Sequence, residues 1–449
     1  MNTRSTGALL RAPLFVSTLC GLFSLGSLGA SARAESLPAE TFTLPNGLRV
    51  VLHEDHRLPT VFLRLRYLAG SSREPAQRTG LAHLLEHLLF HGSTHVADPG
   101  SEYYRAGARH VNASTDQDFV DCYALLPAAN LATGLWIESD RMRFLEPTLS
   151  RGDLLKNERS IVKNERRLRL DAGPAGAVYE QIFAALFPPE HPYHHVPVGS
   201  MADLDRITAA DLRAYYDLHF QPANAALALV GDLDPRAARS LVEKYFGTLP
   251  ATAPPPAPRR VAAGLREERR VSVADPADRE RSIMLAWLAT PAYASVEPMA
   301  LVLKEVLAGR LRRLVPESPL RSATVELLRH QLQSVLTVSL RPRDGVPAEA
   351  ALQAVEPLLA QLRDEPIADE ELAAARAAVR TRALLRLDAL PTKADLLLDY
   401  LAIFGRTNVF DEEMQGLEQV SGVGVRRFAQ AMLRDARRVV IFGNTEVAR

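Results

Sequence analysis

A proline-rich stretch near the middle of the sequence does most to constrain the fold. The segment "LPATAPPPAPRRVAAG", residues 249–264, is too dense in proline for a helix or a central strand and favours extended backbone. It leaves about two hundred residues on each side, a length that suits one domain. The sequence therefore predicts one domain at residues 35–248, a linker at 249–264 and a second domain at 265–449.

The two predicted domains end in the same pattern. Residues 207–234 and 420–444 each resemble a capped helix followed by an apolar strand and a glycine turn. Gly231 and Gly443, which are 443 − 231 = 212 residues apart, hold the same place in it. Duplication of one unit is our interpretation, and chance recurrence of a common helix–strand pattern is the alternative.

Local patterns predict both strands and helices. Asn-Gly at 46–47 between alternating segments predicts a hairpin, and residues 110–127 predict a second strand pair. Residues 348–363 and 369–387 have helical spacing, and Pro357 is expected to kink or split the first of these helices. Because strict βαβ alternation is absent, we expect an α+β fold of two homologous domains, each a mostly antiparallel sheet packed with helices.

The first 34 residues have the features of an export signal. Arg4 and Arg11 precede an apolar stretch rich in small residues, and "ARA" at 32–34 offers a cleavage site. We therefore expect a bacterial periplasmic or secreted protein with a cleavable signal peptide at residues 1–34. An uncleaved membrane anchor is the alternative, and no later segment is apolar enough to span a bilayer.

Charge and cysteine content exclude some classes. Lys+Arg and Asp+Glu are 53 each, so no basic excess points to nucleic acid. Removing residues 1–34 takes away three arginines and no acids, which gives the mature chain a net charge of 0 − 3 = −3. Of the two cysteines, Cys20 lies in the signal, so Cys122 is left without a disulfide partner. We expect Cys122 to be a buried strand residue; a thiol nucleophile is the alternative.

The stretch "GLAHLLEHLLFHGS", residues 80–93, contains a candidate metal site. On a helix, His83 and His87 are four residues apart and share one face, so both imidazoles can reach one zinc ion. Glu86 lies beside that face, where a carboxylate can take a proton from a zinc-activated water. A core helix with hydrogen-bonded histidines is the alternative. His91 is too far along the axis to share a metal with both and is predicted not to be a ligand.

A catalytic zinc needs a third protein ligand from elsewhere in the chain. The segment "KNERSIVKNERR", residues 156–167, offers Glu158 and Glu165, seven residues apart on one helical face. One of them could bind zinc, and the other could hold the second nitrogen of a ligand histidine. A solvated helix with Glu–Arg and Glu–Lys pairs is the alternative.

The chain resembles the pitrilysin-type zinc peptidases with the inverted H-x-x-E-H motif, the family of insulin-degrading enzyme and mitochondrial processing peptidase, in its short bacterial two-domain form. The resemblance covers nearly the whole mature first half, in order, through "LPNGLRVVL", "GSSREPAQRTGLAHLLEHLLFHGS", "NAST", "NERSIVKNERR", "HPYHHVPVGS" and "YYDLHFQPANAALALVGDLD". It implies a zinc-dependent endopeptidase with one zinc ion per chain. The implied ligands are His83, His87 and Glu165, the implied catalytic base is Glu86, and Glu158 supports the site.

The resemblance also implies how substrate and partner bind. Asn112, Ala113 and Thr115 in "NAST" match a strand on which a peptide lies as an added strand, and residues 191–195 match a structural segment whose histidines are expected to be loop or packing residues. Four such domains enclose a chamber, so a two-domain chain is expected to act on short or unfolded peptides as a homodimer or as a heterodimer with a related zinc-less subunit. A non-catalytic or partner-dependent subunit of a processing or binding complex is the competing hypothesis, and hydrolysis of a non-peptide bond is a third.

Some positions depart from the family pattern. Val120 and Cys122 stand where the family usually has Thr and Tyr, and a Gly/Ser-rich segment of the second half is shortened. The family's substrate-binding Arg and Tyr of that half have only weak counterparts here. Tyr400 with Arg380 or Arg382 are the candidates, and helix packing is the alternative for them. These departures concern the grip on substrate rather than the zinc chemistry.

Overall fold

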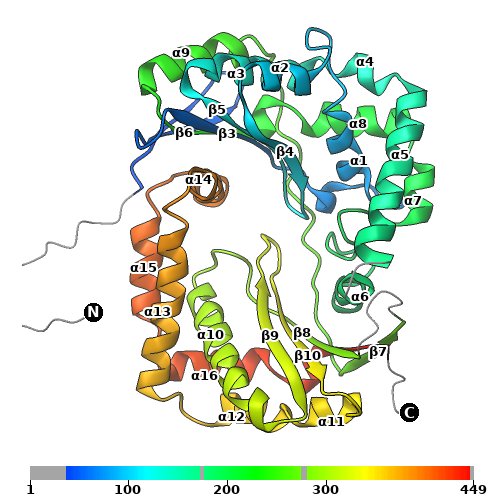
Figure 1. Cartoon of the computed structure of the whole chain (residues 1–449), viewed down its shortest axis with the longest axis vertical. Helices are drawn as coiled ribbons and strands as arrows, with labels where there is room; N and C mark the ends of the chain where they lie inside the picture. Colours follow the sequence, from blue (N-terminus) through cyan, green and yellow to red (C-terminus); the bar gives the residue numbers. More distant parts are fainter. Residues whose placement is uncertain (1–36, 172–175, 275–280, 445–449) are drawn as a thin grey trace, which may run out of the picture. The chain divides into compact units, whose positions relative to one another are not determined.

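The computed structural model describes residues 37–171, 176–274 and 281–444, and they contain two β-sheets, each packed with helices (Figure 1). The predicted signal peptide lies outside the described residues. The first sheet has the strand order β1-β2-β6-β3-β5-β4. Its strands are β1 (Glu40–Thr43), β2 (Arg49–Glu54), β3 (Thr60–Tyr67), β4 (Arg109–Thr115), β5 (Val120–Pro127) and β6 (Ala225–Gly231).

The second sheet repeats this arrangement, without a counterpart of β1 among the described residues. Its strands are β7 (Arg269–Val273), β8 (Ser282–Leu288), β9 (Leu320–Leu328), β10 (Val335–Pro342) and β11 (Arg438–Gly443), in the order β7-β11-β8-β10-β9. The β2–β6 and β7–β11 pairs are parallel, and the other pairs are antiparallel. The predicted α+β fold of two homologous domains is confirmed, because the strands that end the two repeated segments, β6 and β11, hold the same place in their sheets.

Helices follow the strands in a similar order in the two halves. Those of the first half are α1 (Leu81–Leu88), α2 (Pro99–Arg105), α3 (Leu131–Arg143), α4 (Glu146–Leu149), α5 (Gly152–Arg166), α6 (Gly176–Leu186), α7 (Met201–Arg206), α8 (Ala209–His219) and α9 (Pro235–Phe246). Those of the second are α10 (Glu297–Leu314), α11 (Ala348–Gln353), α12 (Glu356–Asp364), α13 (Asp369–Leu385), α14 (Leu390–Phe404), α15 (Phe410–Glu418) and α16 (Gly422–Met432). Pro357 is the second residue of α12, so the predicted helix is split in two there, as expected of a residue that lacks an N–H.

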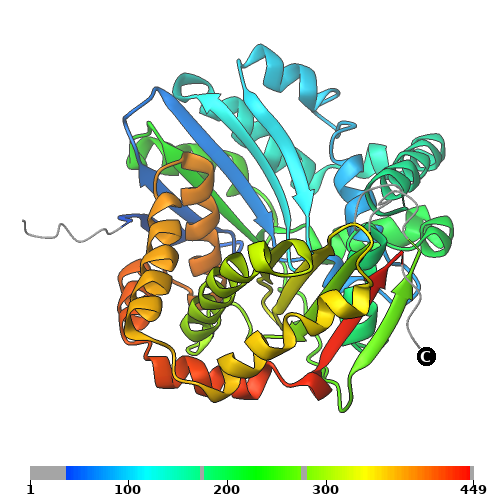
Figure 2. The same cartoon turned by 60° about the horizontal axis from the view of Figure 1, so that its bottom comes forward.

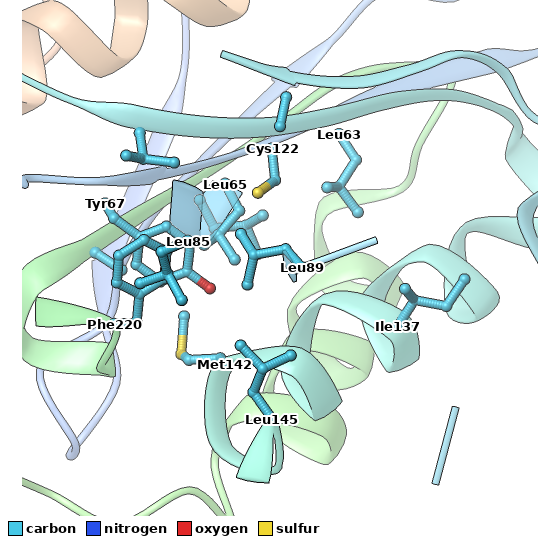
Figure 3. Close-up of a cluster of buried hydrophobic side chains, with 14 of the residues drawn as sticks. Leu63, Leu65, Tyr67, Leu85, Leu89, Cys122, Ile137, Met142, Leu145 and Phe220 are labelled. Carbon is cyan, nitrogen blue, oxygen red and sulfur yellow. The ribbon is translucent and has the colours of Figure 1, made fainter. Parts of the chain in front are cut away.

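The core of the first half fixes α1 against the sheet. Leu85 and Leu89, at the end of α1, pack into the same apolar cluster as Leu63 and Leu65 of β3 (Figure 3). Cys122 of β5 is fully buried in this cluster, as predicted for a strand residue. Burial of these side chains from water holds one face of α1 in place, and its histidine-bearing face is therefore positioned by the sheet.

Each sheet is also covered by a helix from the other half of the chain. Leu397 and Leu401 of α14 share an apolar cluster with Val51 and Phe62 of the first sheet, and α14 lies against that sheet in Figure 1. In the same way, α6 from the first half packs on the second sheet in an apolar cluster that contains Val178, Ile182 and Phe183 with Ala286, Val439 and Ile441. Residues 250–265 contain no helix or strand. The division at residues 249–264 stays a prediction, and the packing of α6 and α14 crosses it.

Buried charges attach α14 to the first sheet. Arg66 of β3 is almost fully buried, and its guanidinium donates to Asp121 (2.8 Å), Asp395 (2.7 Å) and Asp399 (2.6 Å). Lys393 contacts Asp55 at 2.6 Å.

Within the described ranges, no helix combines the length and apolar character needed to cross a membrane.

Candidate metal centre

A buried carboxylate caps the helix that carries the histidines. Gly80, the N-cap of α1, has a φ of 90°, a conformation that favours glycine. Both carboxylate oxygens of Glu74 accept backbone N–H groups of this first turn, from Gly80 (3.0 Å) and Ala82 (2.8 Å). His195 contacts Glu74 at 2.8 Å through Nε2. A negative charge at a helix N-terminus is favourable, so Glu74 stabilises the start of α1.

The structure brings His83, His87 and Glu165 together. The rings of His83 and His87 stand edge to face on α1, with centroids 4.8 Å apart. Glu165 of α5 faces both: its Oε1 lies 3.7 Å from His83 Nε2, and its Oε2 lies 3.4 Å from His87 Nε2. Among the described residues, these three form the one group of His, Cys, Asp or Glu whose ligand atoms converge, all within 4.8 Å of one another.

The geometry of the cluster fits a small tetrahedral cation. Ligand atoms about 2.0–2.2 Å from a tetrahedral zinc lie about 3.4 Å from each other. The two His–Glu separations of 3.7 and 3.4 Å match that spacing. Two neutral imidazoles and one carboxylate also form a donor set typical of zinc, with three protein ligands and a fourth position open.

Glu158 holds the second nitrogen of His87. The side chain of Glu158 is almost fully buried, and its Oε2 lies 3.1 Å from His87 Nδ1. A proton on Nδ1, shared with this carboxylate, leaves Nε2 of His87 with its lone pair toward Glu165. His91 lies beyond α1, which ends at Leu88, and its Nε2 contacts the other oxygen of Glu158 at 2.9 Å. His91 therefore contributes to the environment of Glu158.

Glu86 lies beside the cluster and is oriented by Thr115. The Thr115 hydroxyl donates to Glu86 Oε2 at 2.5 Å, so a strand residue fixes the carboxylate of a helix residue. Burial raises the pKa of Glu86, and the Thr115 hydrogen bond opposes that shift. Glu86 Oε1 accepts no hydrogen bond from the described part of the chain.

His83 is held as a neutral imidazole. Burial lowers its pKa to about 3, and the nearby charges of His87 and Arg169 act in the same direction. A neutral imidazole is the form that binds a metal.

The sequence reasoning did not identify two partners of this cluster. Arg169 lies one turn after Glu165 and contacts its Oε1 at 2.8 Å, and the guanidinium is largely exposed. The i, i+4 spacing of Glu165 and Arg169 was the available signal for that pair. Glu74 is 121 residues from His195, and no local pattern predicts a contact of that kind.

The predicted substrate strand is an edge strand. Residues Asn112, Ala113 and Thr115 belong to β4, which ends the first sheet and pairs only with β5 among the described strands. Asn112 is exposed, Ala113 is buried, and the Thr115 hydroxyl reaches Glu86. The backbone groups on the free side of β4 are therefore open to a further strand.

The candidate substrate residues of the second half are engaged in helix packing. Tyr400 is fully buried in α14, and its hydroxyl donates to Glu413. Arg382 pairs with Glu305, and Arg380 contacts Glu418 at 3.3 Å.

Family models match both halves of the chain. The model described as insulinase, peptidase family M16, matches residues 49–187, and the model described as the peptidase M16 inactive domain matches residues 206–379. The chain belongs to the M16 peptidase family. The resemblance stated from the sequence is thereby confirmed.

Relatives of this M16 chain include proteins named as zinc proteases. It is 28% identical over 445 residues to the zinc protease PqqE of Helicobacter pylori, which is 95% of this chain and 98% of that protein. The fold matches the periplasmic protease PqqL of Escherichia coli with a TM-score of 0.77 and 20% identity, covering 92% of this chain and 48% of PqqL. It also matches a peptidase M16 inactive domain from Pseudomonas fluorescens with a TM-score of 0.78 and 19% identity, over 92% and 99% of the two chains. The names of these relatives therefore support assignment of the chain to the peptidase class and the use of zinc as its metal.

Proposed function

We propose that this M16 chain is a zinc-dependent endopeptidase that hydrolyses short or unfolded peptides. The observation that carries the proposal is the convergence of His83, His87 and Glu165 beside the carboxylate of Glu86. In this proposal the three residues bind one zinc ion, Glu86 is the base, and Glu158 holds His87 in the required tautomer. A zinc ion held there would act as a Lewis acid and lower the pKa of a water molecule.

The surrounding residues support roles in the reaction. Thr115 occupies one oxygen of Glu86, so Oε1 is the atom that takes a proton from water and later returns it to the leaving amine. A peptide that pairs with the free side of β4 along Asn112–Thr115 uses backbone hydrogen bonds, so many side chains can be accepted. This strand contacts the base, and the peptide backbone therefore passes next to it.

We further propose a periplasmic location and a dimer. PqqL is described as periplasmic, and the match to this chain covers 48% of the PqqL chain. Two copies, or one copy and a related zinc-less chain, would supply the same number of domains as one PqqL chain. Each domain here is already covered by helices, so the second chain would complete the substrate chamber rather than the fold.

Zinc content and cleavage test the proposal together. We would purify the mature chain, alone and with any adjacently encoded relative, and measure bound zinc and cleavage of a peptide library. Glu86→Gln is expected to keep zinc and lose about 10²–10⁴-fold in rate, because a positioned base contributes that much. The matched control is Glu243→Gln on α9, an exposed residue paired with Arg239, which is expected to change neither quantity.

The competing hypothesis of a non-catalytic subunit gives a different result. The match to an M16 inactive domain is the observation that favours it. Full zinc occupancy with no cleavage in either preparation, and no effect of Glu86→Gln, would reject the peptidase proposal in favour of that subunit. Loss of zinc from His83→Ala with none from Glu165→Ala would reject the proposed third ligand.

A further inference from the structure

A cavity of about 600 Å³ lies in the second half, away from the metal cluster. It is bordered by α10, α13, α14, α15 and the edge strand β9, and α10, α13 and α15 pack against one another (Figure 1 and Figure 2). Most of its wall is apolar, with side chains that include Leu301, Val379, Phe410 and Met414. A concave apolar space of this size, lined by a few polar groups, is typical of a small-molecule site.

Aromatic rings form one corner of this cavity. Tyr293 and Phe404 line it, with ring centroids 6.0 Å apart and planes nearly perpendicular. Tyr400 lies within 5.8 Å of Tyr293 and 6.3 Å of Phe404, also edge to face. Clusters of aromatic faces attract organic cations, because the face of each ring carries partial negative charge.

A carboxylate without a basic partner lies in the same corner. Glu413 of α15 lines the cavity and accepts a hydrogen bond from the buried Tyr400 hydroxyl. Within the described residues, no Lys, Arg or His nitrogen lies within 4 Å of it. Burial is the largest influence on Glu413 and raises its pKa, although Arg329 and Arg386 oppose that shift from a greater distance. Glu413 is therefore a partly buried carboxyl group without a contacting cation, and a ligand cation placed against it would favour its ionised form.

The other cations of the wall have carboxylate partners. Arg386, which also lines the cavity, contacts Asp395 and Asp399 at 3.4 Å each. Arg329, whose guanidinium lies 4.4 Å from the Tyr293 ring centroid, donates to both oxygens of Glu297 (2.7 and 2.9 Å). On the opposite wall, Lys304 and Arg382 share Glu305, and the carboxylate of Glu326 also lines that end and acts on Lys304, so its charges balance. The cavity thus has a negative, aromatic end at α15 and a charge-balanced end between α10 and α13, with apolar walls between them.

We infer that this cavity binds an organic monocation with an apolar body, an alkyl or aryl ammonium whose charged head lies against Glu413 and the ring face of Phe404. The body fills the apolar space toward Leu301 and Val379. A polyamine is excluded, because its further charges would be buried against apolar walls without partners. The site does not depend on the metal or on peptidase activity.

Calorimetry with three matched probes tests the inference. Octylammonium, octanol and octanoate, each below its micelle concentration, would be titrated into the full mature chain at pH 7. Octylammonium is expected to bind with one site per chain and about 10-fold more tightly than octanol, because only the cation gains the carboxylate and the ring face. Tighter binding of octanoate, which would place its carboxylate at Lys304 and Arg382, overturns the assigned orientation and ligand class.

Paired variants locate the site. Glu413→Gln is expected to weaken octylammonium about 10-fold and leave octanol unchanged, since only the charge is removed. Glu418→Gln is the matched control, because Glu418 lies on the same helix outside the cavity lining and is exposed and paired with Arg380; it is expected to leave both affinities unchanged. Ala383→Phe, which fills the cavity, should abolish binding of both probes. Equal effects of the two glutamate variants, or no binding of octylammonium to the parent chain, would overturn the inference even where Ala383→Phe fails to fold.

Discussion

Two helix pairs occupy equivalent positions in the two halves and differ in chemistry. In the first half, α1 follows β3 and packs against α5; in the second, α10 follows β8 and packs against α13. The α1–α5 pair is joined by two imidazoles and a carboxylate. The α10–α13 pair is joined by ion pairs, Arg310 and Arg313 with Glu371 and Arg382 with Glu305.

The difference shows what a metal centre needs beyond a scaffold. In the second pair, Glu371 is matched by the mostly buried guanidinium of Arg310, and Glu305 is matched by Lys304 and Arg382, so neither carboxylate is left to neutralise an added ion. In the first pair, His83 is held neutral, and Arg169, the cation that contacts Glu165, is largely exposed and screened by water. The same helix packing thus leaves a carboxylate for an added cation only where no basic side chain already neutralises it.

The two helices that cover the sheet of the other half, α14 and α6, here called the exchanged helices, also differ in chemistry. α14 is attached to the first sheet by buried charges as well as apolar contacts, whereas the contacts of α6 with the second sheet are dominated by apolar side chains. Four predictions test these contrasts, in order of expected effect.

Arg66→Ala is expected to cost about 3–5 kcal/mol of unfolding free energy, because the buried Asp121 loses its bidentate partner and keeps only the longer contact with Arg64 at 3.3 Å. The measurement is urea denaturation followed by circular dichroism. Arg239→Ala, which removes an exposed pair with Glu243, is the control and is expected to stay within about 0.5 kcal/mol of the parent. A loss below 1 kcal/mol for Arg66→Ala would show that apolar packing alone fixes α14, as it does for α6.

Glu165→Ala is expected to weaken zinc binding by more than about 100-fold, since loss of a ligand should exceed the loss caused by a residue that only supports one. Zinc affinity would be measured by competition with a chelator. Glu371→Ala, at the equivalent helix pair of the second half, should leave zinc binding unchanged and lower stability only. An equal loss of zinc from both variants would contradict the contrast between the pairs.

Asp55→Asn tests the charged contact between Lys393 of α14 and the first sheet. Hydrogen bonds from Arg57 and Lys393 hold the pKa of Asp55 well below its usual value. A carboxyl with a lowered folded pKa contributes stability above its unfolded pKa of about 3.9, and that contribution is lost as the pH falls through the folded pKa. The variant is therefore expected to be less stable by about 1.5–3 kcal/mol at pH 7, with a difference that shrinks below pH 4. Urea denaturation across this range measures it, and a difference that does not change with pH would contradict the assignment.

The repeated glycines give the smallest effect. At Gly231 a Cβ would lie 2.2 Å from the backbone oxygen of Thr60, and φ is +143°. At Gly443 it would lie 2.3 Å from the Ser282 hydroxyl oxygen, which can rotate away. Gly231→Ala is expected to destabilise by about 1–2 kcal/mol more than Gly443→Ala, because backbone cannot move as a side chain can. Thermal unfolding of the two variants measures the difference, and equal losses would mean that both turns relax alike.

Local chemistry made much of the fold predictable. The hairpin at 46–47, the split at Pro357 and the paired strands at 110–127 follow from turn residues and from the missing N–H of proline, and all three are confirmed. The predicted helix that carries His83 and His87 is also present, though it ends at Leu88, before His91. The packing of α6 and α14 on the sheet of the other half was not predicted, because an apolar helix face does not specify which distant sheet it covers.

The residues of the candidate site were also predictable only where local spacing groups them. His83, Glu86 and His87 could be grouped from spacing on one helix. Glu165 needed the family resemblance, because nothing local indicates that α5 packs on α1. The contacts of Glu74 with His195 and of Arg66 with Asp399 connect residues far apart in the sequence, and single-sequence patterns carry no information about such pairs.

The position of α14 on the first sheet affects when that sheet can be completed during synthesis. Synthesis runs from the N-terminus, so the first sheet is complete after residue 231 but is not covered by α14 until residues 390–404 have emerged. During that interval Val51 and Phe62 remain exposed on an open apolar face. This delay favours collapse of both halves together over stepwise completion of the first, and it makes a truncated product ending near residue 248 prone to aggregation.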